Sequence, residues 1–225
     1  MHKISIPETV RQAVIQRRGK YHVYETLARS KTALVVIDMQ NYFMQPGMPA
    51  EMPIARDIVP NINRLARSVR KAGGKVVWIQ MVCTEKEKSA WTPYFDGMSA
   101  ARQLAVVEHL KPGASGYKLY SELDVSPADD ILEKNRFSAF IQGASKLDEI
   151  LRTAGIDTVL ITGTMTNTCC GSTARDASML NYKTIMIADA NATRNDDEHN
   201  AELVSFLQGY GDVYTTDEVI DLLRN

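Results

Sequence analysis

Cys169 is the residue best placed to do chemistry, because it lies between a segment typical of a buried strand and one typical of a helix. Residues 158–162 are apolar or β-branched, and apolar residues recur at mostly helical spacings in residues 173–182. A cysteine at a helix N-terminus is close to unpaired N–H groups and to the positive end of the helix dipole, which lower the pKa of the thiol and can hold an oxyanion. This position suits attack on a carbonyl. Taken alone, however, the pattern favours two small residues, Cys169 and Cys170, filling space between helix and sheet.

Asp38 and Lys134 are the other candidate groups, since each is the last residue of a predicted strand. Ligands of open parallel sheets bind at the carboxyl ends of the strands, so both side chains should share one edge with Cys169. A carboxylate that ends an apolar strand is partly desolvated, which raises its pKa and lets it act as a base; a neighbouring ammonium opposes that shift and stabilises a thiolate. Each residue also has a structural interpretation, Asp38 as a turn or cap residue and Lys134 as solvated surface.

Strand-like and helix-like segments alternate along the chain, which predicts a three-layer α/β/α sandwich around a mainly parallel six-stranded sheet. Residues 83–126 lack clear periodicity and are expected to form a long, partly helical connection near the site. Residues 1–30 form an N-terminal arm or helix before a single domain at 31–225. The predicted strands are 33–38, 75–81, 130–134, 157–162, 182–188 and 212–214, and the predicted helices include 60–72, 145–154, 196–208 and 216–223.

The composition is that of a soluble globular protein, with 225 residues, 44% hydrophobic residues and 24% charged residues. A net charge of −1 offers no electrostatic argument for binding nucleic acid or an anionic membrane, so a small-molecule partner is expected. The sequence contains neither a membrane-spanning run nor a signal-peptide core, and its three cysteines suit a reducing compartment. We expect a cytoplasmic protein.

Three motifs identify a resemblance. They are D-x-Q-x-x-F at residues 38–43, K-x-R-x-S-A-F at 134–140 and G-x-x-T-N-x-C-x-x-S-T-A-R-D-A at 163–177. From about residue 30 to the C-terminus the chain resembles the isochorismatase-like cysteine hydrolase superfamily, which includes N-carbamoylsarcosine amidase and ureidoacrylate amidohydrolase. The resemblance implies a Rossmann-like hydrolase fold and a catalytic triad of Asp38, Lys134 and Cys169. It also implies a cis peptide bond between Thr164 and Met165, and an oxyanion hole formed by the backbone N–H groups of Met165 and Cys169.

Members of this superfamily catalyse different reactions, and the histidines help to separate them. Nicotinamidases of the superfamily hold a metal through histidines after the first strand, but no histidine lies between Asp38 and Glu108 here. We therefore expect no metal and no cofactor. The reaction that we expect is cleavage of a C–N bond in a small ureido, carbamoyl or amide compound through a thioester on Cys169, with release of ammonia. The alternatives are a vinyl-ether hydrolase of the isochorismatase type and a non-catalytic binding protein that retains the fold.

Substrate contacts are predicted from the motifs and from the irregular connection; they are Gln40, Phe43, Trp91, Tyr94, Arg136 and Asn167. The Arg136 guanidinium could pair with a substrate carboxylate or, equally, with an acidic side chain such as Asp176. Members of the superfamily are commonly dimers or tetramers, which implies a homo-oligomer here.

Overall fold

A six-stranded sheet forms the centre of the molecule, and all its strand pairs are parallel. The computed structural model describes residues 1–224. The strand order is β3-β2-β1-β4-β5-β6, so β1 lies inside the sheet and the chain order changes direction beside it. The strands are β1 Thr32–Ile37, β2 Lys75–Met81, β3 Asp130–Lys134, β4 Thr158–Thr164, β5 Lys183–Ala192 and β6 Asp212–Tyr214.

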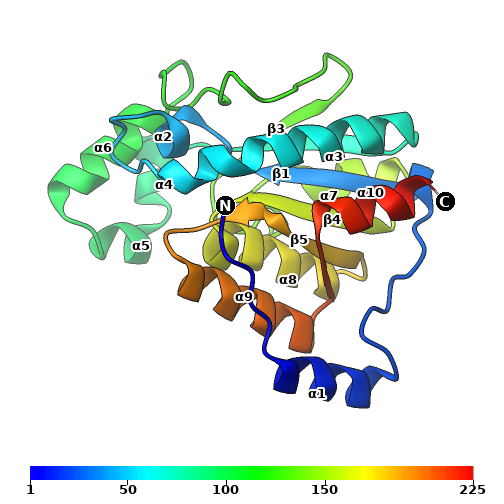
Figure 1. The fold of residues 1–225 in the computed structure, drawn as a ribbon. Coiled ribbons are helices and arrows are strands. Elements are labelled where there is room, and N and C mark those ends of the chain that lie inside the picture. The colour runs from blue at the N-terminus through cyan, green and yellow to red at the C-terminus, as the bar shows by residue number, and fades with distance from the viewer. Residues whose placement is uncertain (225) are drawn as a thin grey trace.

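Helices cover both faces of the sheet (Figure 1). On one face, Leu34 and Val36 of β1 belong to a core cluster with apolar residues of α3 and α10. On the other face, Val35 and Ile37 belong to a second cluster with residues of α7, α8 and α9. The α/β/α sandwich predicted from the alternating segments is thus confirmed. The helices are α1 Glu8–Arg18, α2 Asn41–Met44, α3 Val59–Lys71, α4 Glu85–Ser89, α5 Thr92–Asp96, α6 Ala100–Leu110, α7 Leu147–Thr153, α8 Gly171–Met179, α9 Asp196–Gly209 and α10 Thr216–Arg224.

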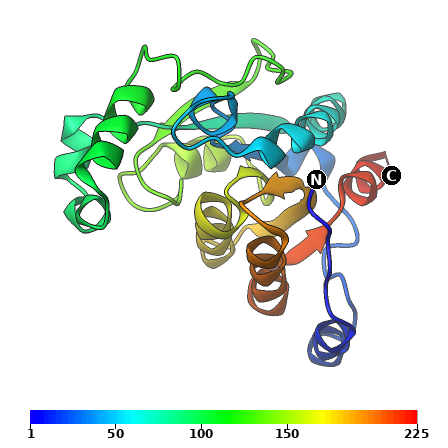
Figure 2. The same cartoon turned by 60° about the vertical axis from the view of Figure 1, so that its left-hand side comes forward.

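Three short helices form much of the connection between β2 and β3, and they lie together at one end of the molecule (Figures 1 and 2). Phe95 of α5 and Val106 and Leu110 of α6 form a separate small apolar cluster with Tyr42 and Met81. The helical part of this aperiodic region therefore folds around a small core of its own at the end of β2, whereas Leu123 further along packs in the core cluster of α3. Searched over residues 1–224, the chain offers no helix of the length and apolarity that a bilayer crossing requires.

The strand boundaries agree with the sequence to within two residues except at β5, which continues to Ala192 and not only to residue 188. Its pairing with β4 shifts register between Ile161 and Gly163. Within this irregular stretch, Asn191 Nδ2 donates to the carbonyls of Ile161 (2.8 Å) and Ile187 (2.7 Å). Asn191 thus lets the strand continue, because its side chain satisfies backbone carbonyls inside the sheet.

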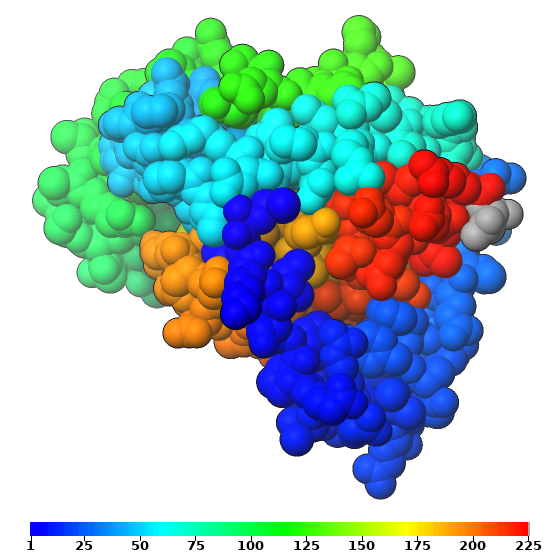
Figure 3. All heavy atoms as spheres, in the orientation of Figure 1, coloured from blue at the N-terminus to red at the C-terminus, as the bar shows by residue number. Residues whose placement is uncertain are grey.

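The first residues of the chain cross the surface over α9 before entering α1 (Figure 3). Helix α1 packs beside α9, and its residue Val14 is 2% exposed because it belongs to the core cluster under α7–α9. The N-terminal arm therefore has fixed contacts with the domain.

Gly163 allows β1 and β4 to approach closely just before the residues of chemical interest. Its φ is +112°, and a Cβ there would lie 2.1 Å from the carbonyl oxygen of Ile37. Next to it, Thr164 Oγ1 donates to the backbone oxygen of Asp38 (3.1 Å). The close approach thus fixes the position of Asp38 relative to the end of β4.

We expect Gly163→Ala to lower the free energy of unfolding by about 3 kcal/mol or more, because the new methyl group meets backbone atoms that cannot move aside. Gly209→Ala is the matched control, since a Cβ at Gly209 meets nothing within 4 Å. Urea denaturation of both variants measures the difference. Equal stability of the two variants would contradict this explanation of Gly163.

Candidate active site

Lys134 connects the predicted acid and thiol at the carboxyl ends of the strands. Its Nζ lies 2.7 Å from Asp38 Oδ2 and 3.3 Å from Cys169 Sγ. A third contact, to the carbonyl oxygen of Arg136 at 3.1 Å, holds the ammonium in place. The exposed fractions are 1% for Asp38, 0% for Lys134 and 9% for Cys169, so the cluster is almost free of solvent. The structure therefore brings together the three residues that the strand ends predicted.

Asp38 follows β1 in a left-handed backbone conformation, with φ of 53°. It is thus the first residue after the strand and not its last, and aspartate is among the few side chains that tolerate this conformation. Apart from the ion pair with Lys134, neither carboxylate oxygen has a hydrogen-bond partner among residues 1–224. A buried carboxylate with free lone pairs is well suited to accept a proton from a group that enters the site.

Burial and mutual attraction set the charges of this cluster. Burial raises the pKa of Asp38, although the Lys134 ammonium opposes the shift. Burial also disfavours the charge on Lys134, but Asp38 and Cys169 outweigh it, so the pKa of Lys134 is raised. The resting cluster is consistent with a carboxylate–ammonium pair beside a neutral thiol.

The prediction that Cys169 has a lowered pKa is wrong. Burial raises the pKa of the thiol, and the Asp38 carboxylate raises it further. Cys169 is the fourth residue of the π-helical turn Thr166–Cys170, which continues directly into α8, so it lies within the first turn of the joined helix. The helix dipole does not outweigh burial and the Asp38 carboxylate. A thiolate must therefore be generated during the reaction.

The turn before Cys169 presents backbone donors to the site. The peptide bond between Thr164 and Met165 is cis. The Met165 carbonyl accepts hydrogen bonds from the N–H groups of Thr168 (3.0 Å) and Cys170 (3.1 Å). The N–H of Met165 itself donates to no acceptor within the described chain, which leaves it free to bind an anionic oxygen.

A cavity of about 210 Å³ opens onto Asp38 and Cys169. Its walls are largely apolar, and α6 contributes part of them, as expected for a connection near the site. A volume of this size fits a small molecule. The other lining residues include Tyr42, Phe43, Met52, Met81, Tyr94, Val106, Leu110, Phe137, Thr164, Met165 and Thr168.

Two of the six predicted substrate contacts, Phe43 and Tyr94, line this cavity. Gln40 does not, because its buried amide is used elsewhere. It donates to the carbonyls of Met81 (3.0 Å) and Tyr117 (2.8 Å) and accepts from the N–H of Met81 (2.7 Å). Gln40 therefore fastens the connection to the end of β2.

Trp91, Arg136 and Asn167 are also outside the cavity lining. Trp91 stacks on Tyr94 with ring centroids 4.2 Å apart, and the Arg136 guanidinium lies 5.0 Å from the Trp91 centroid and donates to the carbonyl of Ala90 (2.8 Å). Asn167 donates to Glu198 (3.1 Å). Arg136 thus supports the aromatic wall from outside the cavity, and its guanidinium is not paired with Asp176 within residues 1–224.

Two charged residues that the sequence did not suggest, Arg102 of α6 and Arg194, line the cavity. Neither guanidinium forms an ion pair with any acidic side chain in residues 1–224. Glu51 also lines the cavity, but its carboxylate already pairs with Arg56 (2.9 Å). Arg194 follows the carboxyl end of β5. The rule that pointed to Asp38, that ligands bind at strand ends, would also have pointed to Arg194 if the predicted fifth strand had continued to residue 192.

No three His, Cys, Asp or Glu side chains gather within residues 1–224 in a way that could hold a metal ion.

Comparison with known proteins gives the same interpretation of the fold. Residues 32–218 match the isochorismatase domain. A cysteine hydrolase from Pseudomonas syringae pv. phaseolicola 1448A superposes with a TM-score of 0.79 at 26% identity, over 88% of this chain and 94% of that one. N-carbamoylsarcosine amidase from Thermoplasma acidophilum gives a TM-score of 0.68 at 30% identity, over 83% of this chain and 97% of that one. An isochorismatase family protein from Burkholderia thailandensis superposes with a TM-score of 0.75 at 27% identity, over 89% of this chain and 98% of that one. With the site geometry, these matches show that the chain belongs to the isochorismatase family of cysteine hydrolases.

Proposed function

We propose that this protein is an amidohydrolase that cleaves a C–N bond of a small ureido, carbamoyl or amide compound and releases ammonia. The observation that carries the proposal is the position of Lys134 Nζ, 2.7 Å from a buried carboxylate and 3.3 Å from a buried thiol. The similarity to N-carbamoylsarcosine amidase, at 30% identity, supports the same reaction class.

The mechanism begins with proton transfer from Cys169 to Asp38. The Lys134 ammonium stabilises the thiolate as it forms, and the sulfur attacks the substrate carbonyl carbon. The C=O bond becomes a single bond to an oxyanion, which the N–H groups of Met165 and Cys169 bind. Because the thiol is neutral at rest, proton removal and attack belong to one sequence of steps, and the free enzyme carries no exposed reactive anion.

Ammonia leaves when the tetrahedral intermediate collapses and Asp38 returns the proton to the departing nitrogen. The acyl group is then held as a thioester on Cys169. Water gives a proton to Asp38 and attacks the thioester carbonyl, and the sulfur leaves as a thiolate that recovers its proton from Asp38. One carboxylate thus serves as base and acid in turn, and the enzyme returns to its starting state.

Arg102 and Arg194 favour a substrate that carries a carboxylate. Their guanidinium groups line the same cavity as Cys169 and have no acidic partner within the part of the chain that the structure describes. A guanidinium binds a carboxylate with two parallel hydrogen bonds. Ureido acids and carbamoyl amino acids combine that anion with a cleavable carbonyl at one end of a small molecule.

We expect Cys169→Ala to lower ammonia release from ureido acids, carbamoyl amino acids, biuret or simple amides by a factor of about 10⁴ or more, because the nucleophile is lost. Cys170→Ala is the matched control and should retain most of the activity, since Cys170 does not line the cavity. An ammonia assay measures both. Activity persisting in Cys169→Ala would overturn the covalent mechanism, and pyruvate release from isochorismate without ammonia would support the vinyl-ether alternative.

The raised pKa of Asp38 predicts an acid limb in the pH dependence of kcat/KM. As the pH falls through that pKa, Asp38 becomes protonated and cannot accept the Cys169 proton, so kcat/KM should fall about tenfold per pH unit. The midpoint should lie above the ordinary carboxyl value of about 4. Iodoacetamide alkylation of Cys169 should follow the same limb. Full activity at pH 4 would contradict the role given to Asp38.

Arg102→Gln and Arg194→Gln should each raise KM for a carboxylated substrate about tenfold or more, since each removes a charge-assisted contact. The amide of the same compound, which lacks the negative charge, should show little change. Steady-state kinetics with the matched pair of compounds measure this. An equal increase in KM for both compounds would show that the arginines act on the cavity shape and not on the charge.

A further inference from the structure

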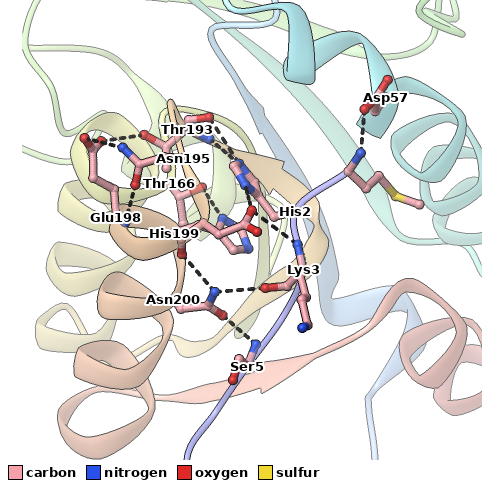
Figure 4. Close-up of polar contacts among 12 residues, drawn as sticks. His2, Lys3, Ser5, Asp57, Thr166, Thr193, Asn195, Glu198, His199 and Asn200 are labelled. Carbon is pink, nitrogen blue, oxygen red and sulfur yellow. Dashed lines mark hydrogen bonds and ion pairs between the residues drawn. The ribbon is translucent and has the colours of Figure 1, made fainter.

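The N-terminal arm contacts the backbone next to Arg194 (Figure 4). His2 is 8% exposed, and its Nδ1 lies 2.8 Å from Asp196 Oδ1. Its Nε2 lies 3.1 Å from the carbonyl oxygen of Thr193 and 3.1 Å from the N–H nitrogen of the same residue. Thr193 is 0% exposed and its carbonyl belongs to the peptide bond that joins it to Arg194. The arm therefore holds the residue immediately before a charged group of the cavity wall.

The carboxylate of Asp196 determines the tautomer of His2. A carboxylate only accepts, so Nδ1 carries a hydrogen. Nε2 then accepts from the N–H of Thr193 when the ring is neutral, or donates to the carbonyl oxygen of Thr193 when the ring is protonated. The hydrogen bond from His2 lowers the pKa of Asp196, which keeps this carboxylate ionised. The contact between the arm and Thr193 thus requires a polar atom at the position of Nε2, and a side chain without one cannot replace it.

His199 extends the contact toward the nucleophile turn. Its ring stacks on His2 with centroids 4.3 Å apart, and its Nδ1 lies 2.9 Å from Thr166 Oγ1 (Figure 4). Burial lowers the pKa of His199 to about 4, so its ring is neutral near pH 7. The remaining charged group at this junction is Glu198, whose Oε2 accepts from Thr193 Oγ1 (3.3 Å).

Arg194 depends on this backbone for its position. Its side chain makes no hydrogen bond or ion pair in residues 1–224, so only its neighbours in the chain fix it. On one side is Thr193, whose backbone contacts His2 and whose hydroxyl donates to Asn167 Oδ1 (2.8 Å). On the other side is Asn195, whose Oδ1 accepts from the Glu198 N–H (2.8 Å) and caps α9. Loss of His2 would free the backbone of Thr193 while its hydroxyl stays bound.

We propose that His2 is a positioning residue that, through Thr193, orients Arg194 toward the cavity and so gives Cys169 a preference for anionic over neutral reactants. The proposal rests on the proposed function in one respect, that Cys169 is the reactive group and Arg194 meets the anion. It assigns to the arm a role in substrate selection, in addition to its packing against α9.

Competitive alkylation of Cys169 by iodoacetate and iodoacetamide tests the proposal without a known substrate. The two reagents differ mainly in charge, and mass spectrometry of the Cys169 peptide gives the ratio of their rates. We expect Arg194→Gln and His2→Ala each to lower the iodoacetate-to-iodoacetamide ratio about three- to fivefold, as loss of a solvent-accessible ion pair allows. Any affinity tag should be at the C-terminus, so that the arm keeps its sequence.

Two amide variants of different length separate positioning from charge and from general destabilisation. The amide oxygen of His2→Gln can accept from the Thr193 N–H, whereas the shorter His2→Asn side chain reaches only Asp196. His2→Gln should therefore restore the wild-type ratio and His2→Asn should not. Ser5→Ala is the control within the arm, because Ser5 contacts Asn200 through its backbone N–H (2.7 Å), and it should leave the ratio unchanged. A wild-type ratio in His2→Ala, or equal rescue by Gln and Asn, would overturn the proposal.

Ammonia assays on the same proteins distinguish the two proposals. If the wild type releases ammonia but His2→Ala keeps the wild-type alkylation ratio, the role of His2 is wrong and the proposed function stands. If no ammonia is released but the ratio changes as expected, the role of His2 stands and the proposed reaction is wrong.

Discussion

The buried ion pair between Lys134 and Asp38 is the interaction on which the rest of the site depends. Removing two charges from water costs several kcal/mol for each ion, which only close pairing can offset, and the 2.7 Å contact provides it. β1 and β3 lie on either side of β2, so the two side chains meet across the end of that strand, where Met81 Sδ lies 3.6 Å from the ammonium. The pair therefore requires that all three strands end at the same level, and the close approach of β1 and β4 at Gly163 then places Cys169 beside it.

The same pair explains why a cysteine with a raised pKa is consistent with a nucleophile. Asp38 and burial both disfavour a thiolate, while Lys134 favours one. Transfer of the proton to Asp38 removes the repulsive charge and leaves the ammonium facing the sulfur, so the thiolate is most stable when Asp38 is protonated. In the proposed mechanism, reactivity thus arises from a coupled proton transfer inside a buried cluster and does not depend on the helix dipole.

The sheet and the three reacting groups could be predicted because each depends on short-range patterns. β1 and β2 contain continuous apolar runs at 33–37 and 76–79, and the candidate reactive residues follow at strand ends, where parallel topology brings them to one edge. The charge state of Cys169 could not be predicted in this way, since desolvation depends on what the whole chain places around the sulfur. The π-helical turn at Thr166–Cys170 was also missed, because five residues of mixed polarity carry no periodicity that separates such a turn from a loop.

The recognition residues were the least predictable for the same physical reason. Arg136 lies in a motif yet supports Trp91, whereas Arg102 and Arg194 lie outside every motif and line the cavity. The positions of Arg102 and Arg194 are set by where α6 folds and where β5 ends. The end of β5 involves Asn191 inside the sheet, and the backbone just after it contacts His2 from the other end of the sequence. The Asp38–Lys134–Cys169 cluster is held at strand ends, whereas the two arginines that we propose meet the substrate lie on a short helix and in a loop that the arm contacts. Because these supports are physically separate, substitutions in α6 or in the arm can change which molecule is accepted while the Asp38–Lys134–Cys169 cluster keeps its geometry.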